Sequence, residues 1–382
     1  MKTTTLSSAS LFLILATTQT VLAFSGSGSG TEPDPYIVTN IDQFQETNND
    51  RNAWYKLGND IEASITCEWN GGTGFVPIGD NSNAFLGCFD GNEHIIIGLF
   101  IKKNAIDCIG VFGKTGQGSE IKNIGFADAD ITGNNYTGGI VGYNYEGTIT
   151  NSYLKGSISG KDNVGGLVGY NRGAITQSYF IGNVCNDHSS GGLVGQNYQG
   201  TIDTSFSVGN VNGDNYVGGL VGWNSNGITT ITNSFSTTKV KGDEYVGGLV
   251  GLNYVSISNS YSTGSVEGEE YLGGLIGYSS GGICNNCFWD TETSGQDVSQ
   301  GGSGKTTEEM MQQITFDPPW DFNNVWDIKE GKTCPFLRDL SVCGGPWHPY
   351  PTGDLNYDCR VNLLDFNIFV SHWLECNSPE CD

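Results

Sequence analysis

A glycine-rich phrase that recurs through the middle of the chain constrains the fold more than any other feature. The phrase Gly-Gly-Leu-Val-Gly, or a close variant of it, begins at Gly138, Gly165, Gly191, Gly218, Gly247 and Gly273. Its copies are separated by 27, 26, 27, 29 and 26 residues, and a degraded copy occupies 109–113. A period this regular predicts a repeat architecture rather than an ordinary globular core.

The remainder of each period predicts short strands separated by turns. In one copy, Ile149 and the aromatic Tyr153 share one parity, and Ile158 follows five residues later. With the glycine phrase this gives three strands in each period, whose aliphatic and aromatic side chains we expect to face one interior. Glycine and β-branched residues oppose a helix throughout the period.

Three short strands bury little surface alone. Coils that stack with about 4.8 Å between neighbouring strands can bury one continuous core. We therefore predict an all-β fold, a parallel β-solenoid (β-helix) over 110–290. A β-propeller is the main alternative, although its blades need about 40 residues and four strands.

The phrase, followed by an aromatic or polar residue and Asn, resembles the GLUG repeat over about 110–290. GLUG repeats occur in bacterial surface and secreted proteins, including adhesin-like proteins and IgA-specific peptidases, where they accompany the catalytic domain. The resemblance implies a scaffold or adhesive module without chemistry of its own. It also implies that 36–109 form an N-terminal cap and irregular first coils.

The two ends of the chain suggest export and capping. Residues 1–23 read as a signal peptide cleaved after Ala23, and its apolar run is too short to span a membrane. We expect a secreted or cell-surface protein with no membrane span. A flexible lead at 24–35 would follow the signal peptide. Residues 291–343 should cap the last coil, with Thr306 or Thr307 starting a short helix, before a linker at 344–352.

Charge and cysteine content narrow the partners and the compartment. The formal net charge of −24 disfavours nucleic acid and anionic lipid as partners. Eleven cysteines in an exported chain make disulfides the default, although the pairing is open and the odd count leaves at least one thiol over. Cys284 and Cys287 suggest a disulfide or stacked cysteines rather than half of a metal site.

Residues 353–382 contain the strongest chemical motif. Six residues that place oxygen atoms at the spacing of a calcium loop are Asp354, Asn356, Asp358, Arg360 through its carbonyl, Asn362 and Asp365. The loop and the amphipathic helix predicted after it resemble one repeat of a type I dockerin. That resemblance implies Ca²⁺ binding and docking to a cohesin-like protein. Cys359 replaces the usual glycine, and no second copy is found, so an acidic turn before a surface helix is the alternative.

Three columns of equivalent residues run along the predicted solenoid. Asn144, Asn171, Asn197, Asn224 and Asn253 suggest an amide ladder. Asn134, Lys161, Asp187, Asp214, Asp243 and Glu269 suggest a solvated turn row, with a calcium stripe as the alternative. Aromatic residues flank the glycine phrase: Tyr136, Tyr216, Tyr245 and Tyr271 before it, and Tyr143, Tyr170, Trp223 and Tyr278 after it. The second group would contact a polysaccharide or cell-surface glycan if exposed, or stack between coils otherwise.

Catalysis is the competing function, because polysaccharide lyases and glycoside hydrolases also use parallel β-helices. A lyase needs a base, for which Arg172 and His188 are the candidates within the clean repeats. A hydrolase needs two facing carboxylates, and Asp128, Asp130, Glu146, Asp162 and Asp203 are available without distinguishing context. We therefore expect a non-catalytic binding scaffold.

Overall fold

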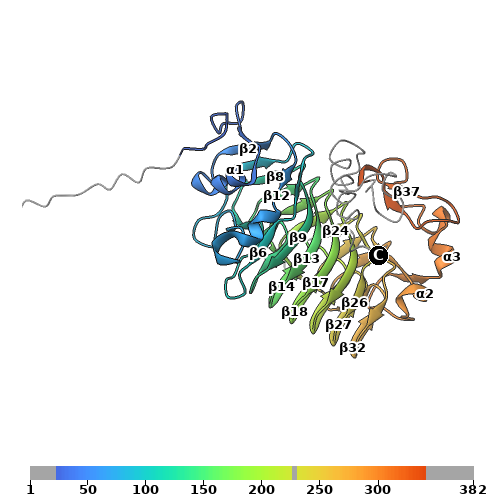
Figure 1. The fold of residues 1–382 in the computed structure, drawn as a ribbon. Coiled ribbons are helices and arrows are strands. Elements are labelled where there is room, and N and C mark those ends of the chain that lie inside the picture. The colour runs from blue at the N-terminus through green and yellow to red at the C-terminus, as the bar shows by residue number, and fades with distance from the viewer. Residues whose placement is uncertain (1–22, 226–229, 341–382) are drawn as a thin grey trace, which may run out of the picture.

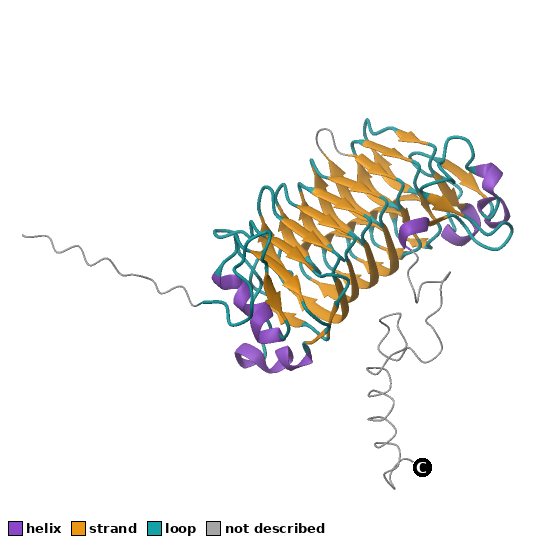
Figure 2. Cartoon of the chain, turned by 90° about the horizontal axis from the view of Figure 1, so that it is seen from above, coloured by secondary structure: helices purple, strands orange, loops and turns teal. Residues whose placement is uncertain are grey.

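The computed structural model describes residues 23–225 and 230–340, which form a parallel β-solenoid with helices at its two ends (Figures 1 and 2). Four parallel sheets of ten, six, seven and thirteen strands run along the solenoid, and a two-stranded antiparallel sheet lies in the C-terminal segment. The predicted all-β solenoid is confirmed.

The seven-stranded sheet contains β7 (Phe112–Thr115), β11 (Val141–Asn144), β15 (Val168–Asn171), β19 (Val194–Tyr198), β23 (Val221–Ser225), β28 (Val250–Asn253) and β33 (Ile276–Ser279). The six-stranded sheet contains β10 (Thr137–Gly138), β14 (Asp162–Gly165), β18 (His188–Gly191), β22 (Asn215–Gly218), β27 (Glu244–Gly247) and β32 (Glu270–Gly273). The ten-stranded sheet contains β1 (Tyr36–Val38), β2 (Trp54–Leu57), β4 (Cys88–Asp90), β8 (Glu120–Lys122), β12 (Thr148–Thr150), β16 (Ala174–Thr176), β20 (Thr201–Asp203), β24 (Thr230–Thr232), β29 (Ser256–Ser258) and β34 (Cys284–Asn285).

The thirteen-stranded sheet contains β3 (Ile61–Glu62), β5 (Ile95–Ile97), β6 (Phe100–Lys102), β9 (Gly125–Thr132), β13 (Tyr153–Ser159), β17 (Tyr179–Cys185), β21 (Phe206–Asn212), β25 (Phe235–Ser236), β26 (Lys239–Lys241), β30 (Tyr261–Ser262), β31 (Val266–Glu267), β35 (Phe288–Asp290) and β36 (Ser303–Lys305). The two-stranded sheet is β37 (Trp326–Asp327) with β38 (Phe336–Leu337). The helices are α1 (Ile41–Glu46), α2 (Thr291–Ser294) and α3 (Thr307–Met310), and the 3-10 helices are η1 (Thr47–Asn49), η2 (Ser64–Gly71), η3 (Gln313–Thr315) and η4 (Arg338–Leu340).

Each central coil passes through all four parallel sheets, so the prediction of three strands per period is wrong. In two coils the stretch in the thirteen-stranded sheet is divided into two strands, β25 with β26 and β30 with β31. Equivalent residues of successive coils pair in register, as Val141 does with Val168 and Ile149 with Ile175. The fourth strand arises because the glycine phrase is divided between two strands. In one copy β14 ends at Gly165, and β15 begins only at Val168.

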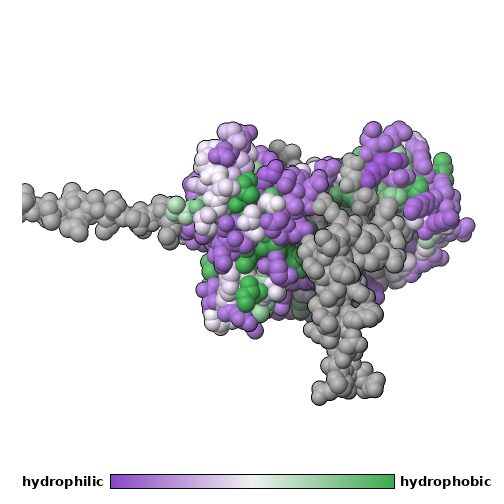
Figure 3. Space-filling view, turned by 45° about the horizontal axis from the view of Figure 1, so that its top comes forward, coloured by the Kyte–Doolittle hydropathy of each residue, from purple (hydrophilic) through white to green (hydrophobic). Residues whose placement is uncertain are grey.

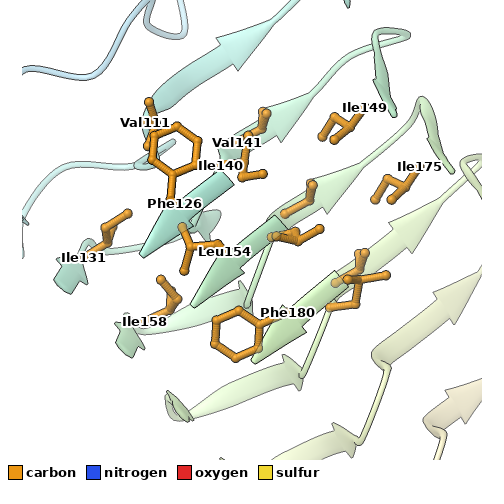
Figure 4. Close-up of a cluster of buried hydrophobic side chains, with 14 of the residues drawn as sticks. Val111, Phe126, Ile131, Ile140, Val141, Ile149, Leu154, Ile158, Ile175 and Phe180 are labelled. Carbon is orange, nitrogen blue, oxygen red and sulfur yellow. The ribbon is translucent and has the colours of Figure 1, made fainter. Parts of the chain in front are cut away.

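The interior is filled by aliphatic columns, as predicted. Equivalent isoleucines of five coils, each at most 1% exposed, are Ile149, Ile175, Ile202, Ile231 and Ile257. Figure 4 shows Leu154, Ile158 and Phe180 in the same interior. Burying each such side chain contributes about 1.5–3 kcal/mol relative to exposure.

The aromatic column does not share this interior, which corrects the sequence prediction. Tyr153 and its counterparts point outward and form a second buried cluster, separate from the main core. The cause is the corner residue Asn151, which adopts a left-handed φ of 47° and shifts the alternation of side chains. As a result Ser152 and Leu154 are buried, while Tyr153 lies between them on the outer face.

The outer aromatic ladder consists of Tyr153, Tyr179, Phe206, Phe235 and Tyr261. Neighbouring rings lie 4.8 to 5.1 Å apart, with planes within 6° of parallel. This spacing matches the distance between strands, so the parallel stack follows from the register of the coils.

Two polar ladders run through the corners of the solenoid. The predicted asparagine ladder is present: Asn144 Nδ2 donates to Asn171 Oδ1 at 2.8 Å, and Asn171 Nδ2 donates to Asn197 Oδ1 at 2.9 Å. The five asparagines are fully buried. A serine ladder was not predicted: the amide of Ser152 donates to Ser178 Oγ at 3.2 Å, and each later coil repeats the bond.

The repeated glycines are needed because backbones meet closely at the corners. A Cβ atom on Gly166 would lie 2.2 Å from the carbonyl oxygen of Gly192, and one on Gly169 would lie 2.6 Å from the amide of Thr137. The left-handed conformation in this corner falls instead on the residue that stands two positions before the glycine pair, such as Tyr136 with φ 56°.

The N-terminal segment closes the first coil. Asn40 caps α1 by accepting a hydrogen bond from the amide of Gln43 at 3.0 Å. Residues 24–35, predicted as a flexible lead, make backbone hydrogen bonds with this segment: the amide of Ile37 donates to Ser27 O at 2.8 Å. The ring of Phe24 also lies 4.6 Å from that of Tyr36, which explains why a Gly/Ser-rich stretch is held in place.

The C-terminal segment does more than cap the last coil. The Oγ of Ser299 accepts hydrogen bonds from the amides of Leu275 and Ile276, so this stretch covers the strand edge of the last coil. Thr306 then starts α3 with a capping box to Glu309, as predicted. The chain continues along the flank, where side chains from 310–340 cover the outer aromatic ladder.

Several sequence predictions fall on residues that the structure does not describe. These are the signal peptide predicted at 1–23, of which only residue 23 is described, the linker at 344–352 and the dockerin-like module at 353–382 with its six candidate calcium ligands. Within the described ranges no helix is long and apolar enough to cross a membrane. The seven cysteines described are free thiols: Cys67, Cys88, Cys108, Cys185, Cys284, Cys287 and Cys334.

Candidate ligand-binding face

The four aromatic residues predicted to contact a ligand occupy one register position of the seven-stranded sheet. Strand pairing places Tyr143 beside Tyr170, and the same column continues through Gln196, Trp223, Leu252 and Tyr278. The rings of Tyr143, Tyr170, Trp223 and Tyr278 are each half-buried. They therefore lie on the outside of the solenoid and do not fill its interior.

A second column of tyrosines runs beside the first, along the six-stranded sheet. Its members Tyr136, Tyr216, Tyr245 and Tyr271 all adopt left-handed backbone conformations, with φ between 53° and 57°. Asn163 and Ser189 take the equivalent positions in the two remaining coils. A left-handed tyrosine is unfavourable, because its Cβ crowds the following carbonyl.

The two columns contact each other and form what we call the aromatic face. Its N-terminal cluster is Tyr136, Tyr143 and Tyr170, with ring centroids 5.0 to 6.1 Å apart. Its C-terminal cluster is Tyr216, Trp223, Tyr245, Tyr271 and Tyr278, with centroids 4.8 to 5.8 Å apart. Ser189 and Gln196 supply small and polar groups in the coil between the clusters.

Two cations flank the N-terminal cluster. Lys114 Nζ lies 5.0 Å from the ring centroid of Tyr143, within the range of a cation–π contact. The guanidinium of Arg172 lies 4.9 Å from the ring of Tyr145 and 5.7 Å from the ring of Tyr198. Its Nη2 also donates to Gln199 Oε1 at 2.9 Å. Lys114 was not predicted to lie on this face, although it follows the degraded glycine phrase as Tyr143 follows the next copy.

The hydroxyl groups of Tyr136 and Tyr170 remain protonated over a wide pH range because their pKa values are raised. Burial raises the pKa of Tyr170 above its ordinary value, and the neighbouring Tyr143 raises it further. Burial also raises the pKa of Tyr136. These two tyrosines therefore present neutral rings whose hydroxyls can donate and accept hydrogen bonds at neutral pH.

The residues considered for catalysis do not form one site. Asp130 lies on β9 of the thirteen-stranded sheet, whereas Asp203 lies on β20 of the ten-stranded sheet. The carboxylate of Asp203 accepts hydrogen bonds from Thr232 and Asn233 of the next coil. Asp128 lies on β9 two residues from Asp130, and both are exposed there. Glu146 lies in the turn after β11, Asp162 on β14, and the two candidate bases Arg172 and His188 on different coils.

The turn row is solvent-facing and carries no metal cluster. Its backbone amides donate to the carbonyls of the coil before, as Asp214 does to Asp187 at 2.9 Å and Asp243 to Asp214. Among the residues described, no group of three or more His, Cys, Asp or Glu side chains is arranged to hold a metal ion. The interpretation as a solvated turn row is therefore favoured over a calcium stripe.

Comparison with known proteins identifies the repeats. The GLUG motif family matches residues 133–159, 213–241 and 242–267, so the chain carries GLUG repeats as predicted. Halomucin of Haloquadratum walsbyi is 36% identical over 158 residues, which are 39% of this chain and 2% of halomucin. A Gly-rich membrane protein of Evansella cellulosilytica is 31% identical over 184 residues, which are 39% of this chain and 21% of that protein.

Among solved structures, an IgA1 protease aligns with 83% of this chain and 26% of its own, with a TM-score of 0.45 and 15% sequence identity. Of the two curated relatives, the chain spans 2% of the length of halomucin and 21% of the length of the Gly-rich membrane protein.

Proposed function

We propose that this protein is a secreted or cell-surface binding scaffold, without catalytic activity, whose aromatic face adheres to polysaccharide or cell-surface glycan. One observation carries the proposal. In four coils a tyrosine occupies the left-handed position beside the column of Tyr143 and Trp223. Another coil has Asn163 at this position, and asparagine adopts the left-handed conformation more readily than tyrosine. Residues in unfavourable backbone conformations persist only where the surrounding structure holds them, and they are concentrated at functional sites.

The geometry of the face suits a sugar chain. Half-buried rings present apolar surface to the apolar faces of sugar rings, and their edges carry hydroxyls for hydrogen bonding. Tyr245 and Tyr271 lie 4.8 Å apart with planes 2° from parallel, so together they form one continuous stacked pair. Lys114 and Arg172 add donors at the other end of the face.

The same proposal includes a calcium-binding tail. The oxygen spacing from Asp354 to Asp365 in the sequence supports Ca²⁺ binding, and the dockerin-like pattern supports attachment to a cohesin-like protein or a matrix. Isothermal titration of the full chain with Ca²⁺ tests this part. We expect one high-affinity site that the D354A/D358A variant loses, and a wild-type chain that binds no Ca²⁺ would contradict it.

An exported location fits the names of two relatives, halomucin and a Gly-rich membrane protein, and the signal peptide predicted at 1–23. Expression of the full chain in a bacterial host, followed by N-terminal sequencing of the exported product, tests the location. A product found outside the cell that begins at Phe24 agrees with the proposal.

Glycan binding is tested with the purified full chain on a glycan array and by affinity electrophoresis in soluble polysaccharides, each with and without a chelator. We expect retention of the wild type that falls in the Y170A and W223A variants. The W54A variant is the matched control, because Trp54 is a half-buried aromatic residue on the ten-stranded sheet, away from the face. Release of reducing sugars or unsaturated products from a bound polysaccharide would replace the scaffold with an enzyme.

A further inference from the structure

A cleft of about 490 Å³ lies in the N-terminal part of the molecule, one coil before the aromatic face. Three segments distant in the sequence line it: the end of α1 with η1, the loop 76–80, and the loop 103–109. Its apolar wall includes Val76 and Ile106, whose side chains are 43% and 52% exposed. Figure 3 shows hydrophobic side chains among hydrophilic ones at the surface of this N-terminal part. The volume lies in the range of sites for small ligands.

The cleft lies one coil before the aromatic face. Cys108 lines the cleft and has the same left-handed conformation as Tyr136, which is its counterpart one coil later. The amide of Ile109 donates to the carbonyl of Tyr136 at 3.1 Å, which fixes this register. Next to Asp80 of the cleft, Lys114 Nζ contacts Asn81 Oδ1 at 3.1 Å on one side and the ring of Tyr143 on the other.

The charged groups of the cleft are balanced. Arg51 and Lys103 bring two positive charges, and Asp80 and Asp107 bring two negative charges. A ligand with a net charge of either sign would therefore meet a like charge, whereas a neutral ligand with many hydroxyls could both donate to the carboxylates and accept from the cations. Polar groups beside an apolar wall are the composition expected for a sugar-binding pocket.

The two carboxylates are engaged as hydrogen-bond acceptors. Desolvation raises the pKa of Asp80, but hydrogen bonds from Ser82 and Asn83 outweigh this effect and leave the pKa below its ordinary value. Asp107 Oδ1 accepts from Asn134 Nδ2 at 2.8 Å and from the amide of Asn135 at 3.2 Å. A general acid for glycosidic cleavage requires a raised pKa, so Asp80 is suited to binding a sugar hydroxyl and not to protonating a leaving group.

We infer that this cleft binds the terminal residue of a neutral glycan whose following residues lie along Tyr143 and Tyr170 of the aromatic face. The inference rests on the proposed function, because it takes the same ligand and adds where its chain ends. It distinguishes an end-binding scaffold from one that binds glycans only along their length.

The test compares short glycans with long ones in the full-length protein. The probes are maltohexaose, cellohexaose, xylohexaose and chitohexaose, and for each a soluble polymer of the same linkage, in which chain ends are scarce. Ile106→Trp fills the cleft from an exposed position, and Lys103→Ala removes a donor. Ile65→Trp is the matched control, because Ile65 is 47% exposed on η2 and does not line the cleft. Thermal unfolding shows that each variant is folded.

We expect I106W, which fills the cleft, and K103A, which removes a hydrogen-bond donor, each to weaken binding of the recognised hexaose by about tenfold. Both variants should leave binding of the polymer unchanged, because chain ends are scarce in it. The Y170A variant should weaken both. Hexaose binding that neither cleft variant alters would overturn the inference and leave the proposed function standing. A wild type that binds none of the probes would contradict the proposed function and the inference together.

Discussion

The ring of Phe235 lies 5.1 Å from that of Tyr261 with the two planes 6° apart, and both rings contact Trp326 of the C-terminal segment. The outer aromatic ladder is therefore a second core that joins the segment 306–340 to the flank of the solenoid. Tyr261 reinforces this junction by donating its hydroxyl hydrogen bond to the carbonyl of Pro335.

Truncation of this ladder should release the C-terminal segment before the solenoid unfolds. Phe235→Ala removes a ring that is 3% exposed and should cost about 3 kcal/mol. We expect limited proteolysis to cleave within 306–340 at protease levels that spare the wild type. Ile314→Ala in the same segment is the control, since Ile314 is 80% exposed and should have no effect. Equal protease resistance of F235A and wild type would contradict this role.

Each bond of the buried asparagine ladder should contribute more to the free energy of unfolding than the same bond between two exposed asparagines. Asn197→Ala leaves Asn224 Oδ1 without this donor in a buried corner, while Asn171 Nδ2 keeps only its bond to the carbonyl of Gly173, so we expect a loss of about 1–3 kcal/mol. Asn210→Ala is the matched control, because Asn210 Nδ2 donates to Asn183 Oδ1 at 2.8 Å across the same coil spacing but in solvent. Denaturant unfolding should rank the loss for N197A well above that for N210A, and equal losses would argue against a structural ladder.

Close contact, and not backbone conformation, should limit substitution of the repeated glycines. A Cβ atom on Gly192 would lie 2.1 Å from the carbonyl oxygen of Gly219, so Gly192→Ala should destabilise the fold by more than about 3 kcal/mol or prevent folding. Gly118 has a left-handed φ of 80° and no atom within 4 Å of such a Cβ. Gly118→Ala should therefore cost only about 1–2 kcal/mol, which thermal unfolding can measure.

The left-handed tyrosines should be dispensable for stability and required for binding. Tyr245→Asn removes stacking worth about 0.5–1.5 kcal/mol, while Asn tolerates the left-handed conformation better. We expect a thermal midpoint close to that of the wild type together with weaker glycan retention. A large loss of stability in Y245N would instead assign the tyrosine column a structural role.

Thiol reactivity should follow burial and should change with pH. Burial raises the pKa of Cys108 to about 11 and that of Cys88 to about 12, so both thiols stay protonated at pH 8. Iodoacetamide at that pH should modify the exposed Cys67 and Cys185 first, as peptide mass spectrometry can show. The raised pKa values also make the free energy of unfolding depend on pH, because the unfolded chain loses these two thiol protons at lower pH than the folded protein does. The two thiols leave the free energy of unfolding unchanged below about pH 9 and lower it as the pH rises toward 11 and 12. Rapid labelling of Cys108 in the native protein would contradict its burial.

The interior of the solenoid was predictable because one signal repeats in every coil. The isoleucine at position 149 and its counterparts recur with the glycine phrase, and register alone then stacks them. The outward direction of Tyr153 was not predictable from alternation, because a single left-handed residue, Asn151, changes the parity between the two. Asn and Gln recur at that corner position, and the structure shows that they indicate a left-handed residue that reverses the alternation of side chains.

The aromatic face was predicted in part and the cleft not at all. Tyr143 and Trp223 follow the glycine phrase at a fixed distance, so their common column could be inferred from spacing. Arg51, Asp80 and Lys103 come from irregular segments of the N-terminal cap, where no period relates one residue to another. Only the folded arrangement brings these three together.

Every amide of the asparagine ladder points the same way along the axis, and the row is closed at both ends. Thr115 Oγ1 donates to Asn144 Oδ1 at 2.7 Å at one end, and Asn253 Nδ2 donates to the carbonyl of Val255 at 2.8 Å at the other. A duplicated or deleted period would therefore rejoin without an orphaned hydrogen bond. A chain of such coils can gain or lose whole periods of 26 to 29 residues while the contacts that close its two ends stay unchanged.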